Sequence, residues 1–474
     1  MSPILRPFSA LALAVGLALS GTARADTLLE IYEMALKNDP VLKAAEASYK
    51  AGREAEALGR SALLPRVGAQ ASYGESDLSA KAKYSFGNFA TDQEVSGEQK
   101  EYYLNLEQRI FDLSAWFSFK RGKELSKQSE AQFALDQQDL VVRTVEAYIN
   151  VLRAIDNLKS SKAEEAAYQR QLEQTQQRFE VGLIAITDVH EARAAYDLSV
   201  VNRLTDEGNL GIAYEALSVL SGQPHANLWL LSEEFPVQEP QPASREQWVD
   251  MALKGNFLVK TAEYAAEAAR DASQAAKYEH LPKVTGSITA LDTSSDDDID
   301  DNNTGLSYPT YQDRDGSTFT ITMSVPLYAG GGISAQRRQA YAQSIAARET
   351  YTAVTRDTIQ LTRSLHLGVV TDVQRVKARK QAIVSAQSAL DATQAGYEVG
   401  TRNIVDVLDA QRIVFGAIRD YANTRYDFVV RLLRLRKQAG ILNPGDVEAL
   451  NKWLVEPGAA TASAASETSL PATP

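Results

Sequence analysis

Two hydrophobic spacings alternate along the chain, one helical and one extended. Helical patterns rich in Ala and Glu cover residues 27–60 and 245–279, and each stops near a proline, Pro65 or Pro282. Proline ends a helix because it lacks a backbone N–H. Beyond each proline, apolar residues recur at every second position. This alternation predicts four strands with one apolar and one polar face, at about residues 66–73, 102–111, 283–291 and 318–328.

Long stretches without proline follow the second strand of each pair. They predict helices over residues 113–180 and 334–397, each about 100 Å long at a rise of 1.5 Å per residue. Apolar residues of the first helix form two flanks, which suits the wall of a hollow helical cylinder better than a single coiled-coil seam. Gly182 and Gly400 end these helices, and shorter helices are predicted at about residues 184–221 and 402–439.

The order of helix, two strands, long helix and short helix occurs twice. The segment MALK at residues 34–37 recurs at residues 251–254, so that Met34 corresponds to Met251, a shift of 217 positions. Such a duplication predicts two repeats of one structural plan. The predicted divisions are a first repeat at 26–222, a proline-containing equatorial linker at 223–244, a second repeat at 245–440, an equatorial C-terminal segment at 441–456 and a disordered tail at 457–474.

Four such strands cannot form a closed membrane barrel alone. A tilted strand crosses a bilayer in about 9 to 11 residues, and the polar segments Gly74–Glu101 and Asp292–Gly316 are expected to be long outer loops. In lipid no strand edge can remain unpaired, and about eight strands form the smallest barrel. The chain must therefore assemble, with three copies supplying twelve strands or two copies supplying a tight eight-stranded barrel.

Composition narrows the classes of function. The 474 residues carry a formal charge of −12, which argues against a nucleic-acid binder because neutralising phosphates requires a basic face. The chain has no cysteine, which excludes disulfides and thiolate chemistry. Its four histidines are scattered, and the glycine run at residues 330–332 lacks the Lys and Ser or Thr of a phosphate-binding loop. We therefore expect no enzyme activity, metal or cofactor.

The N-terminal residues predict export. Arg6 precedes an apolar run from Phe8 to Ser20, and Ala23-Arg24-Ala25 forms a small-x-small cleavage motif before Asp26. Residues 1–25 are therefore expected to be a signal peptide. Beyond them, no apolar run reaches the length of about 18 residues that a transmembrane helix requires.

Two segments carry a resemblance to a known family. They are QRFEVGLIAITDV at residues 177–189 and GYEVGTRNIVDVLDA at residues 396–410, and they resemble TolC-type outer-membrane channel-tunnel proteins, the outer membrane efflux protein family. The resemblance covers nearly the whole chain after the signal peptide, apart from the outer loops and the tail. It implies an α+β membrane protein in the outer membrane of a Gram-negative bacterium. The expected assembly is a homotrimer with a 12-stranded β-barrel, continued by a 12-helix tunnel in the periplasm.

The resemblance also implies a function and partners. The channel would be a passive exit duct for tripartite efflux pumps and type I protein secretion. It would dock onto a periplasmic adaptor and an inner-membrane transporter of the RND, ABC or MFS type. From the residues alone an alternative remains, a periplasmic coiled-coil adaptor or scaffold without a pore. That alternative explains the helices but leaves four amphipathic strands unexplained.

Two acidic residues follow the second predicted helix turn. Asp406 and Asp409 are three positions apart and would lie on one helical face. They are explained either by the favourable dipole of a helix N-terminus or by a ring of six carboxylates in a trimer. The resemblance implies the ring, which would form the selectivity constriction at the periplasmic entrance.

Further entrance residues are implied by the resemblance. Contacts that hold the entrance closed would join Tyr397 and Arg402 to Thr187, Asp188, Gln171 and Gln177, and the adaptor-docking tips would be Gly182, Leu183, Gly400 and Thr401.

The chain departs from the family pattern at His190 and Glu191, where amides are expected. One hypothesis is that Glu191 deepens the negative potential at the entrance and that His190 makes it sensitive to pH. The alternative is that both side chains face solvent outside the tunnel.

Overall fold

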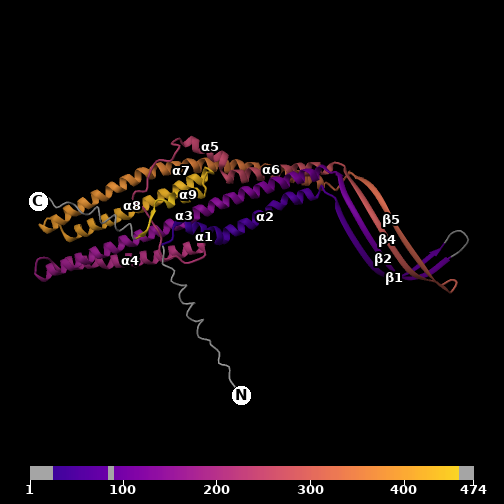
Figure 1. The fold of residues 1–474 in the computed structure, drawn as a ribbon, viewed down its shortest axis with the longest axis horizontal. Coiled ribbons are helices and arrows are strands. Elements are labelled where there is room, and N and C mark those ends of the chain that lie inside the picture. Colours follow the sequence, from indigo (N-terminus) through magenta and orange to yellow (C-terminus); the bar gives the residue numbers. More distant parts are fainter. Residues whose placement is uncertain (1–24, 84–89, 458–474) are drawn as a thin grey trace, which may run out of the picture. The chain divides into compact units, whose positions relative to one another are not determined.

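The computed structural model describes residues 25–83 and 90–457, which belong to two compact units (Figure 1). Of the described residues, the helical unit combines 25–47, 132–259 and 354–457, and the sheet unit combines 48–83, 90–131 and 260–353. The expected signal peptide and disordered tail fall, but for Ala25 and Pro457, outside the described residues. Within the described ranges, no helix is both long enough and apolar enough to span a membrane.

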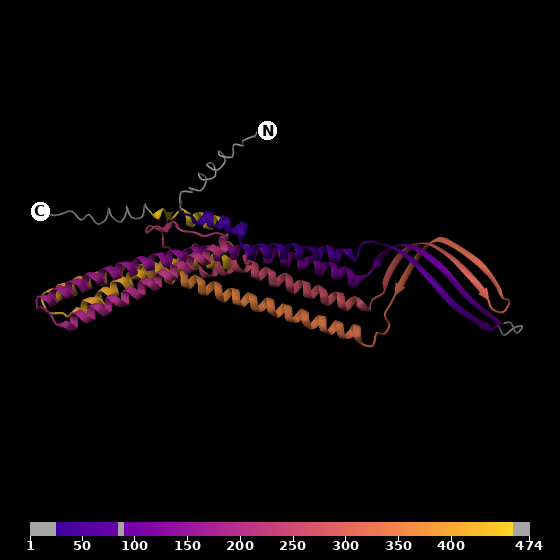
Figure 2. The same cartoon turned by 90° about the horizontal axis from the view of Figure 1, so that it is seen from below.

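The sheet unit is built around four antiparallel strands. These are β1 (Arg66–Lys83), β2 (Ala90–Phe111), β4 (Lys283–Asp301) and β5 (Leu306–Ser324). Their order is β1-β2-β4-β5, so the strand pairs of the two repeats meet at β2 and β4 (Figure 2). Among the described residues, β1 and β5 each pair with a single neighbour and form the two edges.

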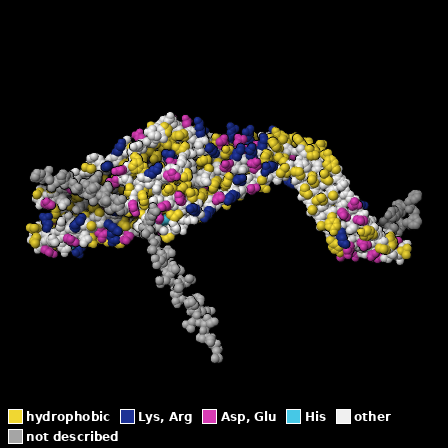
Figure 3. All heavy atoms as spheres, in the orientation of Figure 1, with side chains coloured by type: hydrophobic (Ala, Val, Ile, Leu, Met, Phe, Trp, Pro, Cys, Tyr) yellow, Lys and Arg dark blue, Asp and Glu magenta, His cyan; other side chains and the backbone are white. Residues whose placement is uncertain are grey.

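Strand register gives the sheet one apolar face near the helices. One row of directly paired residues on this face consists of Val67, Leu106, Ile288 and Phe319. The adjacent row points to the opposite face, because side chains alternate along a strand, and consists of Gly68, Asn105, Thr289 and Thr318. Hydrophobic side chains gather over these strands in Figure 3. The four strands thus have the two-faced character that the alternation predicts.

The strands are longer than the sequence pattern predicts, and the expectation of two long outer loops is wrong. Most of Gly74–Glu101 and Asp292–Gly316 is strand, and the turn between β4 and β5 is confined to residues 302–305. Gly, Asp and Glu have low strand propensity, but pairing with a neighbour overrides it, as in the pair Glu98 and Asp296. In contrast, β5 ends at Ser324 instead of residue 328, because Pro326 follows.

Each strand of the sheet is continued at one end by a helix, and the helices follow the order of the strands. α2 (Pro40–Ser61) precedes β1, α3 (Leu113–Glu180) follows β2, α6 (Phe257–Lys277) precedes β4, and α7 (Gly332–Glu398) follows β5. A Cβ at Gly122 of α3 would lie 2.3 Å from the carbonyl oxygen of Ala55 in α2. Glycine is therefore required for this close approach. The rings of Phe117 in α3 and Tyr278 stack with centroids 5.1 Å apart.

Two predicted helices are each broken in two. The first divides into α1 (Leu28–Asn38) and α2 because Pro40 interrupts the helical hydrogen bonds. The second divides into α5 (Arg245–Gly255) and α6, where the Asn256 side chain accepts from the backbone N–H of Val259 at 3.2 Å and starts a new helix. A 3-10 turn, Tyr278–His280, connects α6 to the sheet.

The helical unit contains two helical hairpins. α3 turns into α4 (Ile186–Ser221), and α7 turns into α8 (Ile404–Gln438). Their core includes the fully buried Tyr148, Leu152, Trp248, Phe428 and Leu435. The linker and the C-terminal segment meet where β3 (Leu230–Leu231) pairs with β6 (Leu454–Val455), and α9 (Pro444–Asn451) precedes β6.

Ion pairs connect α3 to α8 along the helical unit. They are Asp139 with Lys437, Glu146 with Arg434, Arg153 with Asp427 and Glu164 with Arg419. The last pair has an N–O distance of 2.7 Å, and its Glu164 side chain is only 4% exposed. These contacts hold helices of the two repeats together.

Candidate functional site

The turns of the two hairpins are built in the same way. Gly182 and Gly400 both have a positive φ, 78° and 79°. In the first turn the N–H of Leu183 donates to the carbonyl of Arg178 at 2.9 Å, and in the second the N–H of Thr401 donates to Gly396 at 2.8 Å. This six-residue bond and a left-handed glycine define a Schellman ending. Both glycines therefore stop their helices, as the sequence predicts.

The turns expose apolar side chains to solvent. Val181 and Leu183 are 71% and 68% exposed, and Val399 is 76% exposed. Gly182, Gly400 and Thr401 are exposed as well. Singly exposed apolar side chains are common on protein surfaces, so the docking role of the turns stays a prediction.

A small hydrophobic cluster brings the four hairpin helices together just behind the turns. Tyr168 of α3 packs with Ile404 and Leu408 of α8, and the partly buried Tyr196 of α4 and Tyr397 of α7 pack against them. The Tyr168 hydroxyl donates to the carbonyl of Leu408 at 3.2 Å. Burial raises the pKa of Tyr168 to about 12, so its hydroxyl remains a donor. The cluster thus joins α3, α4, α7 and α8 close to the two turns.

Asp406 has a structural role at the start of α8. Its N–H donates to the Asn403 side chain at 2.8 Å, and its carboxylate accepts from the Asn403 N–H at 3.3 Å. This reciprocal pair is a capping box. The Arg402 guanidinium lies 3.9 Å from the same carboxylate. Asp406 thus lies in the first turn of α8, where the explanation from the helix N-terminus expects an acid, and this place is compatible with a second role.

Asp409 is exposed one turn further along α8. Its carboxylate lies 2.8 Å from the guanidinium of Arg412. Each of the two acids thus has an arginine beside it, which lowers the net negative charge at this position. Arg412 lies on α8, three positions from Asp409, a spacing that indicates a helical ion pair, whereas Arg402 precedes the N-cap Asn403 and lies outside α8. The sequence prediction included Arg402 in another role and missed Arg412.

The environment of Tyr397 combines a cation with an unsatisfied hydroxyl. The Arg178 guanidinium lies 4.9 Å from the centre of the Tyr397 ring, within the range of a cation–π contact. The hydroxyl is buried, and within the described part of one chain it has no hydrogen-bond partner. A buried hydroxyl without a partner costs free energy, which makes Tyr397 a candidate for a contact with another copy.

One chain does not bring the predicted closing contacts together. Within the described residues, the hydroxyl of Thr187 donates to its neighbour Asp188 at 3.3 Å, and no hydrogen bond joins either residue to Tyr397 or Arg402. Gln171 is buried and Gln177 is exposed. The pairings themselves stay predictions for the assembled protein.

His190 and Glu191 lie on the exposed side of α4, between the buried Val189 and Ala192. This placement fits solvent-facing side chains in one chain, and it leaves both hypotheses about the tunnel as predictions.

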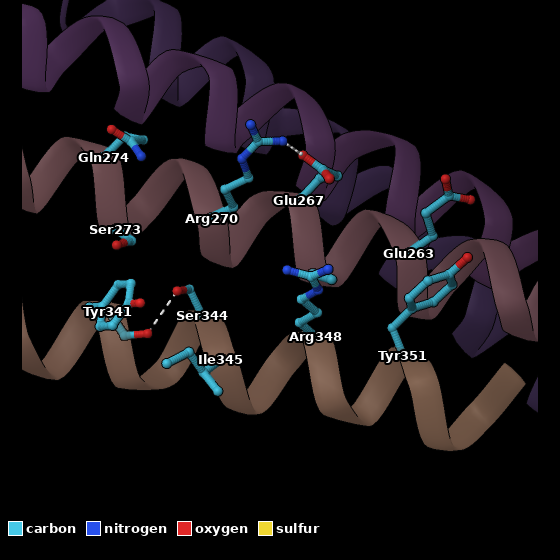
Figure 4. A pocket seen from close by; sticks show the side chains of 11 residues that line it. Glu263, Glu267, Arg270, Ser273, Gln274, Tyr341, Ser344, Ile345, Arg348 and Tyr351 are labelled. Carbon is cyan, nitrogen blue, oxygen red and sulfur yellow. Dashed lines mark hydrogen bonds and ion pairs between the residues drawn. The ribbon is translucent and has the colours of Figure 1, made fainter. Parts of the chain in front are cut away.

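A separate cleft of about 630 Å³ lies between α6 and α7 in the sheet unit (Figure 4). Tyr341, Arg348 and Tyr351 of α7 point toward α6 (Figure 4). Across the cleft, Arg270 pairs with Glu267 of its own helix at 3.2 Å. The lining holds no convergent set of groups for catalysis, and we interpret the cleft as space between neighbouring helices.

Comparisons with known proteins agree on one family. The sequence model of the family described as "Outer membrane efflux protein" matches residues 31–223 and 248–440. The outer membrane protein TolC of Vibrio cholerae serotype O1 is 35% identical over 438 residues, covering 92% of this chain and 95% of that protein. The alkaline protease secretion protein AprF of Pseudomonas aeruginosa is 29% identical over 424 residues, covering 89% of this chain and 86% of that protein.

The fold is shared with solved structures of distant sequence. The CmeC outer membrane channel of Campylobacter jejuni superposes with a TM-score of 0.73 at 16% identity, covering 91% of this chain and 90% of that one. At this identity the likeness concerns the fold.

Proposed function

Because the chain belongs to the outer membrane efflux protein family, we propose that three copies form one continuous channel with a gated periplasmic entrance. The resemblance seen at residues 177–189 and 396–410 is confirmed by this membership. The protein is an outer-membrane exit duct for efflux and type I secretion. In the proposed trimer, a 12-stranded barrel crosses the outer membrane and a 12-helix tunnel extends into the periplasm.

The sheet with two free edges carries the proposal. Among the described residues, the two outer strands of the sheet, β1 and β5, are each paired on one side only, and lipid does not tolerate unpaired edges. Pairing β1 of one copy with β5 of the next removes every edge in a closed ring. Three copies give twelve strands, which leaves a lumen, whereas eight strands from two copies would be filled by side chains.

A pore-free scaffold would leave these strands without a function. Sucrose-gradient fractionation separates the two cases, because the channel sediments with outer membranes as a trimer and a scaffold stays soluble.

Exposed apolar residues on the outer helices support assembly in the helical unit. On α4, Leu198, Val201, Ile212 and Val219 are 59%, 56%, 70% and 71% exposed. On α7, Leu361, Leu367 and Val384 are 44%, 61% and 56% exposed. The four α4 residues share one face of their helix, whereas the three α7 residues are spread around theirs. The α4 face is buried if α4 of one copy packs against α7 of the next, as in a cylinder wall.

The entrance is proposed to close where α8 begins. Three copies place Asp406 and Asp409 in a ring of six carboxylates, with Arg402 and Arg412 reducing its charge. We assign the closing contacts to Tyr397 and Arg402 on one side and to Thr187, Asp188, Gln171 and Gln177 on the other. The buried Tyr397 hydroxyl, which has no partner within the described part of one chain, supports a contact of this kind. Charge-assisted hydrogen bonds contribute about 1.5 to 3 kcal/mol each.

The partners are proposed to meet the channel at the turns. Gly182, Leu183, Gly400 and Thr401 lie beside the exposed Val181 and Val399, and these turns are the proposed docking surface for a periplasmic adaptor. The adaptor in turn connects the channel to an inner-membrane transporter.

Ion selectivity tests the proposed entrance. Asp406→Asn with Asp409→Asn removes the ring charge, while an Asn oxygen can still accept the capping hydrogen bond at position 406. We expect the cation selectivity of single channels, measured as a reversal potential in a salt gradient, to fall toward zero. The control is Glu246→Gln with Asp250→Asn on α5, two exposed acids outside the hairpins. Equal loss of selectivity in both variants would contradict the assignment.

The same measurement separates the two hypotheses for Glu191. If Glu191 lines the entrance, Glu191→Gln lowers cation selectivity. Unchanged selectivity places Glu191 outside the tunnel.

A further inference from the structure

The ends of the helices next to the sheet are strongly basic. Four segments adjoin the strands, residues 50–66, 113–127, 267–283 and 332–348, and together they contain 14 Lys and Arg against 6 Asp and Glu. The whole chain has a net charge of −12, so these segments form a basic island in an acidic protein. Figure 3 shows Lys and Arg gathered over the helices beside the strands.

The far ends of the strands have the opposite charge. Residues 74–101 and 292–316 contain 14 Asp and Glu against 4 Lys and Arg. Between the two lies the apolar face with the row of Val67, Leu106, Ile288 and Phe319. The apolar part of the sheet is thus bordered by positive charge on the side of the helices and by negative charge on the other.

Aromatic rings lie among the basic residues at the helix ends. Trp116 is 45% exposed, with its ring 5.7 Å from that of Phe119. The Lys120 ammonium is 5.2 Å from the centre of the Phe117 ring, and the Lys277 ammonium is 5.5 Å from the Tyr278 ring. Aromatic rings that accompany long basic side chains are typical of the boundary between hydrocarbon and headgroups.

The first turns of α3 supply cations that are free to bind an anion. Within the described residues, no carboxylate lies within ion-pair distance of Lys120, Arg121 or Lys123, all three of which are exposed. A groove of about 470 Å³ between α3 and α6 is lined by Phe117, Lys120, Lys123 and Arg270.

The acids that face this groove are Glu124, Glu267 and Asp271. Glu124 is paired with Lys127 at 2.7 Å and Glu267 with Arg270 at 3.2 Å. Burial raises the pKa of Asp271, against the opposing charge of the nearby Lys120. Two of the three acids are thus paired with other cations, and within the described residues Lys120 and Lys123 have no carboxylate at ion-pair distance.

We propose that this aromatic–basic belt, formed by Trp116, Phe117, Lys120, Arg121, Lys123, Lys277 and Tyr278, binds the headgroups of anionic phospholipids. The proposal rests on the proposed function, because the barrel places the belt at the leaflet that faces the periplasm. Lysine and arginine attract the phosphate of an anionic lipid, and each contributes about 1 kcal/mol near a charged surface. A zwitterionic headgroup carries no net charge and gains little from the same residues. The belt thus selects lipids by charge and fixes the height of the barrel in the bilayer.

Lipid retention by the purified full-length assembly tests the proposal. The protein is extracted from vesicles of about 30% phosphatidylglycerol, an anionic lipid, and about 70% phosphatidylcholine, a zwitterionic lipid. Its bound lipids are counted by native mass spectrometry. The triple variant Lys120→Gln, Arg121→Gln and Lys123→Gln should lower the preference for phosphatidylglycerol by about tenfold or more. The control is Lys159→Gln, Lys162→Gln and Arg170→Gln, three exposed cations elsewhere on α3, and it should retain the preference.

Two outcomes would overturn the belt. One is an unchanged preference in the Lys120, Arg121 and Lys123 variant, and the other is an equal loss in the control. Single-channel conductance, measured on the same samples, distinguishes a failure of the belt proposal from a failure of the proposed channel function. A belt variant that conducts like the unmodified channel and keeps its lipid preference refutes the belt alone, whereas an unmodified protein that does not conduct refutes the channel.

Discussion

Removing Arg419 should loosen the link between the two hairpins. Arg419 of α8 pairs with Glu164 of α3 at 2.7 Å, with side-chain exposures of 26% and 4%. Arg419→Met would leave the Glu164 carboxylate buried without its partner, at a cost of about 3 kcal/mol. The matched change Arg434→Met breaks a pair between the same two helices, also at 2.7 Å, but Arg434 and Glu146 are 55% and 27% exposed. An exposed pair of this kind contributes about 0.2 to 1 kcal/mol.

Thermal unfolding in detergent and single-channel conductance measure the consequence. We expect Arg419→Met to lower the unfolding temperature clearly more than Arg434→Met does. It should also raise conductance, because α8 carries Asp406 and Asp409 at the proposed constriction. Adding Glu164→Gln to Arg419→Met removes the unpaired buried charge and should recover much of the stability. Equal shifts for the two arginine variants, or no recovery in the double variant, would refute the reasoning.

Three further changes test other parts of the structure. Tyr397→Phe with Arg402→Ser removes two proposed closing groups and should raise single-channel conductance in planar bilayers; unchanged conductance in a correctly assembled trimer would count against them. Burial raises the pKa of the Asp156 carboxyl above its ordinary value of 3.8, so the folded protein binds the carboxyl proton more tightly than the unfolded chain does. The folded protein therefore loses stability as the pH rises from 3.8 through the raised pKa. Asp156→Asn should therefore increase the unfolding temperature more at neutral pH than near pH 3.8, and a larger gain at the acidic pH would contradict the sign. Gly122→Ala places a Cβ 2.3 Å from a backbone oxygen, whereas the Cβ of Gly416→Ala meets nothing within 4 Å. Both variants gain about 1 kcal/mol of helix propensity. Thermal unfolding should therefore show that Gly122→Ala is less stable than Gly416→Ala by about 1 to 3 kcal/mol.

The helix ends could be predicted from the sequence because their causes are local. Gly182 and Gly400 adopt a positive φ at the ends of α3 and α7, and the helices end at Glu180 and Glu398, within a residue of the predicted ends. Pro40 breaks a helix that the pattern alone extends. In each case one residue type determines the backbone at its own position.

The far ends of the strands could not be predicted in this way. Residues such as Glu98 and Asp296 have low strand propensity, and they form a strand pair because the neighbouring residues are already in register. That cause lies in another part of the chain, almost two hundred positions away, and it leaves no local alternation to detect.

The candidate site was predictable to a similar extent. The spacing of Asp406 and Asp409 indicates one helical face, and Arg412 could have been recognised at three positions from Asp409. The contact of Arg178 with the Tyr397 ring joins two different hairpins, and no spacing within either hairpin indicates it.

The most direct test of the account is the copy number of the conducting particle. The protein is purified from outer membranes, its mass is measured by native mass spectrometry, and the same preparation is inserted into planar bilayers. The account predicts a particle of three chains that conducts ions. A folded particle of one or two chains with the same conductance would contradict it.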